Sequence, residues 1–133
     1  MMATLEHTNF TVRDPQASAA WMHKVFGWKT RWEGPAIAGG YTVHVGTKHT
    51  YLALYAPSDP QLSGESSYDI VGGLNHVGVL VEDIDTTEKK VIDAGFTPKS
   101  HADYEPGRRF YFNDDNDIEF EVISYDKSVP GNT

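Results

Sequence analysis

Polar and apolar side chains alternate at the start of the chain. Between residues 4 and 12, one side of the pattern carries Thr8, Phe10 and Val12, and the other carries His7, Asn9 and Thr11. Alternation with a period of two is typical of a β-strand with one buried face. We therefore predict a strand over residues 4–12 that turns His7 away from the packed side.

A helix is expected directly after this strand. Asp14 is the type of residue that caps a helix N-terminus, and Pro15 suits the first helical position. Apolar residues at helical spacing continue as far as Phe26, and Gly27 ends the helix. The predicted buried stripe consists of Ala17, Trp21 and Val25, with Met22 and Phe26 beside it.

Three strand-like segments complete the first half of the chain, at roughly residues 28–33, 40–46 and 49–56. Ser, Asp, Pro, Gly and Glu dominate residues 57–73, which is the composition of a linker.

The second half repeats this plan. It predicts a strand at residues 74–82, a helix capped by Asp83 or Asp85 that runs through Ala94, and a stop at Gly95. The apolar stripe of this helix is thin and consists of Val91, Ile92 and Ala94. Further strands are predicted at residues 96–101, 109–113 and 118–125.

The two halves match in register. Leu5, His7, Val12 and Asp14 recur as Leu74, His76, Val81 and Asp83, at a constant offset of 69 residues (76 − 7). Such self-similarity indicates internal duplication. We predict one α+β domain, built of two βαβββ modules at about residues 4–56 and 74–125. Each helix covers one face of its strands, and the other faces form a curved mixed sheet around a cavity that receives one histidine from each module.

Composition excludes several kinds of site and partner. The chain has no cysteine, so a disulfide, a thiol nucleophile and a thiolate metal site are all excluded. A net charge of −8 argues against nucleic acid and anionic membrane as partners. No apolar run has the length of a membrane span, and no signal-peptide core follows the first residues, so a cytoplasmic protein is expected.

The last predicted strand brings carboxylates to the same face as the histidines. Its apolar positions face the helix, so Glu119 and Glu121 face the cavity. We match this strand to residues 52–55 of the first half, which puts Ala53 at the position of Glu119. Two imidazoles and one carboxylate suit a divalent transition metal and leave positions open for water or substrate.

These residues carry a resemblance to a known family. The segments Leu5–Val12, Leu74–Val79 and Phe110–Phe120 resemble the vicinal oxygen chelate superfamily, which includes glyoxalase I, extradiol dioxygenases, fosfomycin-resistance transferases and bleomycin-binding proteins. The resemblance covers essentially residues 4–125 and implies the glyoxalase-like fold. The family usually writes the last turn as Asp-Pro-Asp-Gly-Asn, whereas this chain has the shorter Asp114–Asp117.

The resemblance also implies roles for single residues. His7, His76 and Glu119 match the family's metal-ligand positions, and Ala53 falls where glyoxalase I has a fourth ligand, a carboxylate. The remaining three ligands are similar to the set of the extradiol dioxygenases and fosfomycin transferases. Some members line the cavity with side chains at the positions of Asn9, Arg109 and Tyr111. The relatives further imply a homodimer.

Other polar residues are weaker candidates. Glu121 and Tyr111 are candidates for proton transfer. Three other roles stay open for Glu121: it could hydrogen-bond a metal ligand, be the metal ligand itself in place of Glu119, or be a solvated residue at the sheet edge. Arg109 in the cavity would attract a carboxylate or phosphonate. For Tyr51, a place in the core and a place in the cavity lining both stay open. For His49 and His101, substrate contact competes with a simple surface role, which is the commoner fate of a strand histidine.

Two functions follow as hypotheses. In the first, an enzyme binds two neighbouring oxygens of a small substrate at a divalent ion, which is Fe(II) for a dioxygenase and Mn, Ni, Zn or Mg for a transferase or isomerase. In the second, a metal-free protein of the bleomycin-resistance type sequesters a flat or zwitterionic small molecule between aromatic walls.

Overall fold

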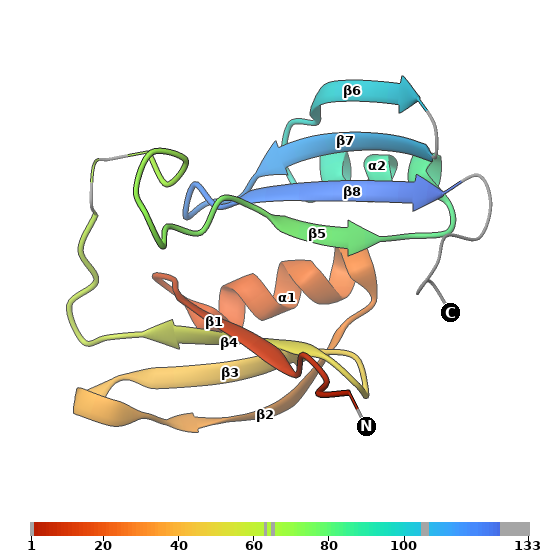
Figure 1. Ribbon diagram of the computed structural model, residues 1–133. Coiled ribbons are helices and arrows are strands. Elements are labelled where there is room, and N and C mark those ends of the chain that lie inside the picture. The colour runs from red at the N-terminus through yellow and green to blue at the C-terminus, as the bar shows by residue number, and fades with distance from the viewer. Residues whose placement is uncertain (1, 63, 65, 105–106, 126–133) are drawn as a thin grey trace. The chain divides into compact units, whose positions relative to one another are not determined.

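The computed structural model describes residues 2–62, 64, 66–104 and 107–125 (Figure 1). The chain divides into two compact units, Met1–Ser63 and Gly64–Thr133. The division falls inside the stretch 57–73 that the sequence indicates as a linker. In the described part of that stretch the backbone forms only turns and bends.

The first unit contains four strands and one α-helix. The elements are β1 (His7–Thr11), α1 (Pro15–Phe26), β2 (Lys29–Pro35), a short 3-10 helix η1 (Ile37–Gly39), β3 (Tyr41–Gly46) and β4 (Tyr51–Ala56). The strand order is β1-β4-β3-β2. β1 runs parallel to β4, and the other pairs are antiparallel.

The second unit has the same architecture. Its elements are β5 (Val77–Leu80), α2 (Ile84–Asp93), β6 (Lys99–Tyr104), β7 (Gly107–Asn113) and β8 (Glu119–Tyr125). The strand order is β5-β8-β7-β6, and β5 runs parallel to β8. The predicted fold class is confirmed: α+β, with the βαβββ plan written twice as two mixed four-stranded sheets, neither of which closes on itself. The short helix η1 was not predicted.

The first helix begins and ends where the sequence predicts. The Asp14 side chain accepts a hydrogen bond from the Ala17 backbone N–H at 3.1 Å, and Gly27 ends the helix in a left-handed conformation with φ of 76°. The predicted stripe was partly wrong. The buried residues of α1 are Pro15, Ser18, Ala19, Met22 and Val25. Ala17 is exposed, and Trp21 lies at the edge of the packed side, against Phe26. Two of these five buried residues, Ser18 and Ala19, are small.

The second helix corrects another prediction. Asp83 is the N-cap, accepting hydrogen bonds from the Thr86 backbone N–H and hydroxyl at 3.0 and 2.8 Å. The buried residues are Ile84, Thr87 and Val91, whereas Ile92 is 54% exposed. The predicted stripe was thin because part of the packed face is a threonine. The Thr87 hydroxyl is satisfied by donating to the Asp83 backbone carbonyl.

Each helix packs on one face of its own sheet, and large apolar side chains fill the space between them. In the first unit, Met22, Val43, Val45 and Leu54 are fully buried, and in the second unit Val91, Phe110, Phe112, Phe120 and Val122 are. The other face of each sheet is left to polar and aromatic side chains. We call it the distal face, because it lies away from the helix of the same unit.

The corrected face of α2 can be tested with two neighbouring residues. Val91→Ala removes two buried methyl groups and should lower the free energy of unfolding by about 2 kcal/mol. Ile92→Ala removes more carbon from an exposed position and should change it by less than about 0.5 kcal/mol. Urea denaturation followed by circular dichroism measures both. Equal losses for the two variants would show that the helix face is assigned wrongly.

Candidate functional site

The distal face of the first unit begins with His7. In the parallel pair of β1 and β4, His7 lies opposite Tyr51 and Asn9 lies opposite Ala53. Leu52 and Leu54, which alternate with these residues on β4, are buried on the helix side. The predicted alternation of β1 is therefore confirmed, and His7 and Asn9 both lie on the distal face.

Aromatic rings form a row across this face. Tyr51 stacks on His7 with ring centroids 5.0 Å apart and on His44 at 4.7 Å, and His44 contacts Trp32 at 5.2 Å. The guanidinium of Arg31 lies 4.3 Å above the Tyr51 ring. Burial in this row lowers the pKa of His44, and the charges of His7 and Arg31 act in the same direction. The stacked Tyr51 ring therefore restricts the movement of the His7 ring on one face.

A carboxylate holds the edge of the His7 ring. Glu6 Oε1 lies 2.9 Å from His7 Nδ1 and also accepts from the Tyr51 hydroxyl at 3.4 Å. The hydrogen bond from His7 is the main cause that lowers the pKa of Glu6. His7 Nε2 makes no hydrogen bond in the part of the chain that the structure describes.

The distal face of the second unit is built in the same way. Val77 lies opposite Phe120 in the parallel pair of β5 and β8, so one residue earlier His76 lies beside Glu119. Gly78 lies opposite Glu121. Tyr111 and Asn113 on β7 pair with Glu121 and Glu119, so they belong to the same face. The strands thus bring the predicted residues His76, Glu119, Glu121 and Tyr111 together, and Arg109 contacts Glu121.

Register also corrects one sequence match. His7 lies opposite Tyr51 in the first unit, as His76 lies beside Glu119 in the second. Tyr51, and not Ala53, is therefore the counterpart of Glu119, whereas Ala53 corresponds to Glu121. The sequence match was wrong by two residues because alternation repeats every two residues and cannot distinguish registers that differ by two. No carboxylate stands at either position of β4.

Two side chains donate hydrogen bonds to the Glu119 carboxylate. The Tyr68 hydroxyl donates to Glu119 Oε1, and Lys99 Nζ lies 3.2 Å from Oε2. Burial alone would raise the pKa of Glu119, but the hydrogen bonds from Tyr68 and Lys99 outweigh it and lower the pKa. The same hydrogen bond raises the pKa of Tyr68 to about 12, which keeps its phenol a donor at neutral pH.

Glu121 bridges a cation and a histidine. Arg109 Nη1 donates to Glu121 Oε2 at 3.0 Å, and His76 Nε2 lies 3.2 Å from Oε1. The side chains of Arg109 and Glu121 are only 15% and 14% exposed. The Arg109 guanidinium lies 4.6 Å above the Tyr104 ring. Burial and the neighbouring Glu121 carboxylate raise the pKa of Tyr111, whose ring meets the edge of the His76 ring.

Two buried nitrogens of this face lack a partner. Among the described residues, His76 Nδ1 and Arg109 Nε are buried and make no hydrogen bond. A buried nitrogen without a hydrogen bond costs free energy, so a ligand or ion that bonded to either nitrogen would recover that free energy. For His76 the orphaned atom belongs to a residue type that binds transition metals.

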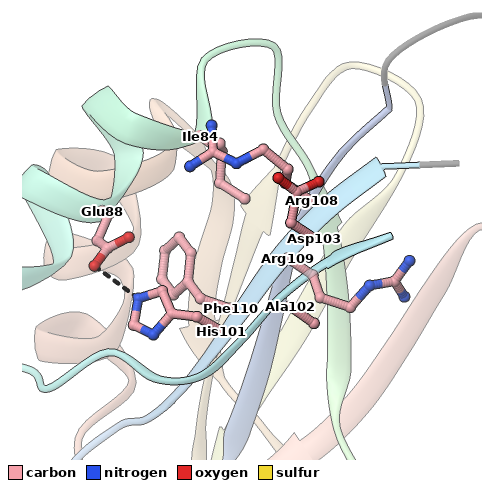
Figure 2. Close-up of a pocket in the computed structure, with 8 residues that line it drawn as sticks. All are labelled: Ile84, Glu88, His101, Ala102, Asp103, Arg108, Arg109 and Phe110. Atoms are coloured by element: carbon pink, nitrogen blue, oxygen red, sulfur yellow. Dashed lines mark hydrogen bonds and ion pairs between the residues drawn. The ribbon is translucent and has the colours of Figure 1, made fainter. Parts of the chain in front are cut away.

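His101 and His49 lie apart from these groups. His101 is on the helix side of β6, where its Nε2 lies 2.9 Å from Glu88 Oε2 on α2 and its ring stacks on Phe110. Figure 2 shows this pair at a pocket of about 240 Å³ between α2 and β6–β7, with the Arg109 guanidinium pointing away from it. The sequence predicts His49 at the start of a strand, but in the structure it is exposed in the turn before β4.

Comparison with known proteins settles the family. A model of the Glyoxalase/Bleomycin resistance protein/Dioxygenase superfamily matches residues 4–122. The chain belongs to this superfamily. The resemblance predicted from the sequence is thereby confirmed. No curated protein matches the sequence significantly.

Solved structures of the glyoxalase superfamily share the fold. A glyoxylase/bleomycin resistance protein/dioxygenase domain from Frankia sp. EAN1pec has a TM-score of 0.81 at 20% identity, over 97% of this chain and 96% of that one. The fosfomycin resistance protein FosX from Mesorhizobium loti gives 0.71 at 22%, over 98% and 96%. FosX from Listeria monocytogenes, complexed with Mn(II) and sulfate, gives 0.72 at 16%, over 98% and 97%.

Within the described residues, no three histidine or carboxylate side chains come together as a ready-made metal site. The predicted set of His7, His76 and Glu119 draws on both units and stays a prediction. The donor types of this set nevertheless fit a divalent ion. In the described part of the chain, His7 and His76 each have one ring nitrogen that makes no hydrogen bond. Glu119, beside His76, is ionised because its pKa is lowered. In the described parts, no helix is long and apolar enough to cross a membrane.

Three residues that contact His7 or Glu119 were not predicted from the sequence: Glu6, Tyr68 and Lys99. Glu6 carries no signal in the sequence, because its side chain turns back to the neighbouring His7. Tyr68 comes from the stretch taken as a linker, and Lys99 on β6 reaches Glu119 on β8 across β7. The sequence favours a surface or hydrogen-bonded role for His44, whereas the structure places it in the row of rings, opposite Ala53.

The environment of Glu119 gives a test by pH. Because its folded pKa is lowered, the stability this carboxylate contributes is present above its unfolded value and is lost as the pH falls through the folded value. Tyr68→Phe removes one donor and should raise the pKa of Glu119, measured by carboxyl-detected NMR titration. Tyr41→Phe removes a hydroxyl that donates to Glu33 in the first unit, and serves as the control. An unchanged pKa in Tyr68→Phe would refute the assigned hydrogen bond.

Proposed function

We propose that this protein is a cytoplasmic metal-dependent enzyme that binds a small substrate through two neighbouring oxygens. His7, His76 and Glu119 would hold the divalent ion. The proposal is carried by one observation: a buried His76 nitrogen without a partner stands beside an ionised Glu119, on the strand position that repeats that of His7.

The relatives support a divalent ion. FosX from Listeria monocytogenes was solved with Mn(II), and a variant of it with Mn(II) and a dihydroxypropylphosphonic acid. We therefore take Mn(II) as the first ion to test, with Fe, Ni, Zn and Mg as alternatives. The ion would supply Lewis-acid stabilisation of negative charge that develops on the substrate oxygens.

The protein's own residues would then orient the substrate and move protons. Tyr111 would donate a hydrogen bond from its hydroxyl to a substrate oxygen, because its raised pKa makes it a weaker acid than an ordinary tyrosine. Glu121 is less suited to act as a base, because both of its oxygens already contact Arg109 and His76. Asn9 and Tyr51 would line the substrate site from the first unit, and Arg109, with its free Nε, from the second. We also propose that the protein is a homodimer, as the family resemblance implies.

Metal titration tests the proposal. Full-length protein freed of metal should bind Mn(II) saturably, with one ion per chain by isothermal titration calorimetry. His7→Ala, His76→Ala and Glu119→Ala should each weaken binding by roughly 100-fold or more, because each removes one of three ligands. The matched control is His49→Ala, which removes an exposed turn histidine and should bind as wild type does. Absence of binding by the wild-type protein would refute the proposal.

The row of rings in the first unit favours a second candidate, a metal-free binder of flat molecules. His7, Tyr51, His44 and Trp32 offer an aromatic wall, and the acidic chain suits a cationic guest. Proflavine, a flat cation, would then quench tryptophan fluorescence saturably and equally with and without EDTA. Loss of quenching in EDTA, or none at all, would exclude this candidate.

A further inference from the structure

Glu6 and Glu121 are two carboxylates for which neither the family pattern nor the proposed ligand set has a role. We infer that each holds one of the two repeat histidines in a fixed orientation and tautomer, so that a single ring nitrogen is left to bind the ion. Both roles depend on the proposed function, because they concern the same two histidines.

At His7 the contact determines which nitrogen carries the proton. An ionised carboxylate can only accept a hydrogen bond, and Glu6 Oε1 lies 2.9 Å from Nδ1. Nδ1 therefore bears the proton and donates, which leaves the lone pair on Nε2. The ring has little freedom to turn, because Tyr51 stacks on it and donates to the same Glu6 oxygen.

At His76 the same logic selects the other nitrogen. Glu121 Oε1 lies 3.2 Å from Nε2, which favours the proton there and leaves the lone pair on Nδ1. Nδ1 is the nitrogen that is buried without a partner. Glu121 itself is held by Arg109, at 3.0 Å from its second oxygen, and both side chains are almost fully withdrawn from water. The carboxylate that orients His76 is thus fixed more firmly than the one at His7.

The two carboxylates reach their histidines by unrelated routes. Glu6 precedes its histidine directly, and at an offset of 69 the second half has Asn75 there. Glu121 comes from the neighbouring strand, where the first unit has Ala53. Duplication alone therefore does not explain the pairing. A histidine that donates one N–H to a carboxylate is a more basic and better oriented metal ligand, and loss of such a partner weakens metal binding by roughly 10- to 100-fold.

The same contacts separate this role from that of a ligand. Both carboxylates have both oxygens engaged, Glu121 by Arg109 and His76, and Glu119 by Tyr68 and Lys99. Only Glu121 contacts the His76 ring, at Nε2, the nitrogen on the other side of the ring from the unpaired Nδ1. This contact suits Glu121 to orient the ring and leaves Glu119, beside His76 by strand register, as the ligand. If Glu121 orients His76, its loss weakens the metal site. If Glu121 were the ligand in place of Glu119, its loss would remove the site.

The first measurement is Mn(II) affinity, by calorimetry on metal-free full-length protein. Glu121→Gln should weaken binding by roughly 10- to 100-fold, and Glu6→Gln, at an exposed position, by about 10-fold. Glu119→Gln should weaken it more than either. Glu82→Gln removes the same charge from a side chain without a hydrogen bond in the described part, and should stay within about twofold of wild type. Circular dichroism verifies that each variant is folded.

The second measurement reads the tautomers without any metal. Long-range ¹H–¹⁵N correlation on the metal-free protein should show a proton on Nδ1 in His7 and on Nε2 in His76. In Glu6→Gln the proton of His7 should shift toward Nε2, while His76 stays unchanged. Circular dichroism of the same Glu6→Gln sample verifies that the shift at His7 does not come from a general loss of structure, and the proton on Nδ1 of His7 in the wild type is the decisive signal.

The outcomes distinguish the two levels of the proposal. No Mn(II) binding by wild type overturns the proposed function. Wild-type binding with unchanged affinity in both Glu6→Gln and Glu121→Gln, or the opposite tautomer at His7, overturns the orienting role alone. Loss of binding in Glu121→Gln as complete as in Glu119→Gln would make Glu121 a ligand and likewise overturn it.

Discussion

The parallel pairing of the first and last strand of each unit is the constraint on which the site depends. It places His7, the first residue of β1, opposite Tyr51 of β4, and His76, the residue before β5, beside Glu119 of β8. A slip of one residue would turn these side chains into the helix-covered layer. Phe120 and Val122 prevent that slip, because both are fully buried on the helix side and alternate with the two glutamates.

Charge compensation on the distal face of the second unit follows from this placement. Two carboxylates two residues apart point the same way in an acidic chain, and each is only about 15% exposed. Lys99 and Tyr68 stabilise Glu119, and Arg109 and His76 stabilise Glu121. An ion bound at Glu119 would therefore replace the Lys99 ammonium as the cation beside this carboxylate. This exchange gives Lys99 and Tyr68 a part in setting how tightly the ion is held.

The contribution of each histidine differs because its neighbours differ. His7 is stacked in a row of rings and bonded to the residue before it, on an exposed edge. His76 is set against Tyr111 and a withdrawn carboxylate. Duplication thus preserved the positions of the two imidazoles, while their surroundings diverged. The distal face of the first unit presents a row of rings, and that of the second unit presents charge and a phenol.

Sequence patterns were sufficient for the features that depend on local periodicity. The alternation around His7, the caps at Asp14 and Asp83, and the repeat itself predicted the order of elements and the fold. They failed where burial is decided by contacts between elements, as for the exposed Ile92 and the buried Ser18 and Thr87. They also failed where alternation alone cannot distinguish strand registers two residues apart, as with Ala53 and Tyr51. Contacts made across strands or from a loop, such as those of Lys99 and Tyr68 with Glu119, leave no periodic signal.

The central claim is that the two histidines and Glu119 serve one ion. A crystal structure of the full chain grown with Mn(II), with anomalous diffraction data to locate the metal, tests it most directly. The account predicts a single strong anomalous peak bonded to His7, His76 and Glu119 together. A peak bonded to only one of the histidines, or none at either, would contradict it.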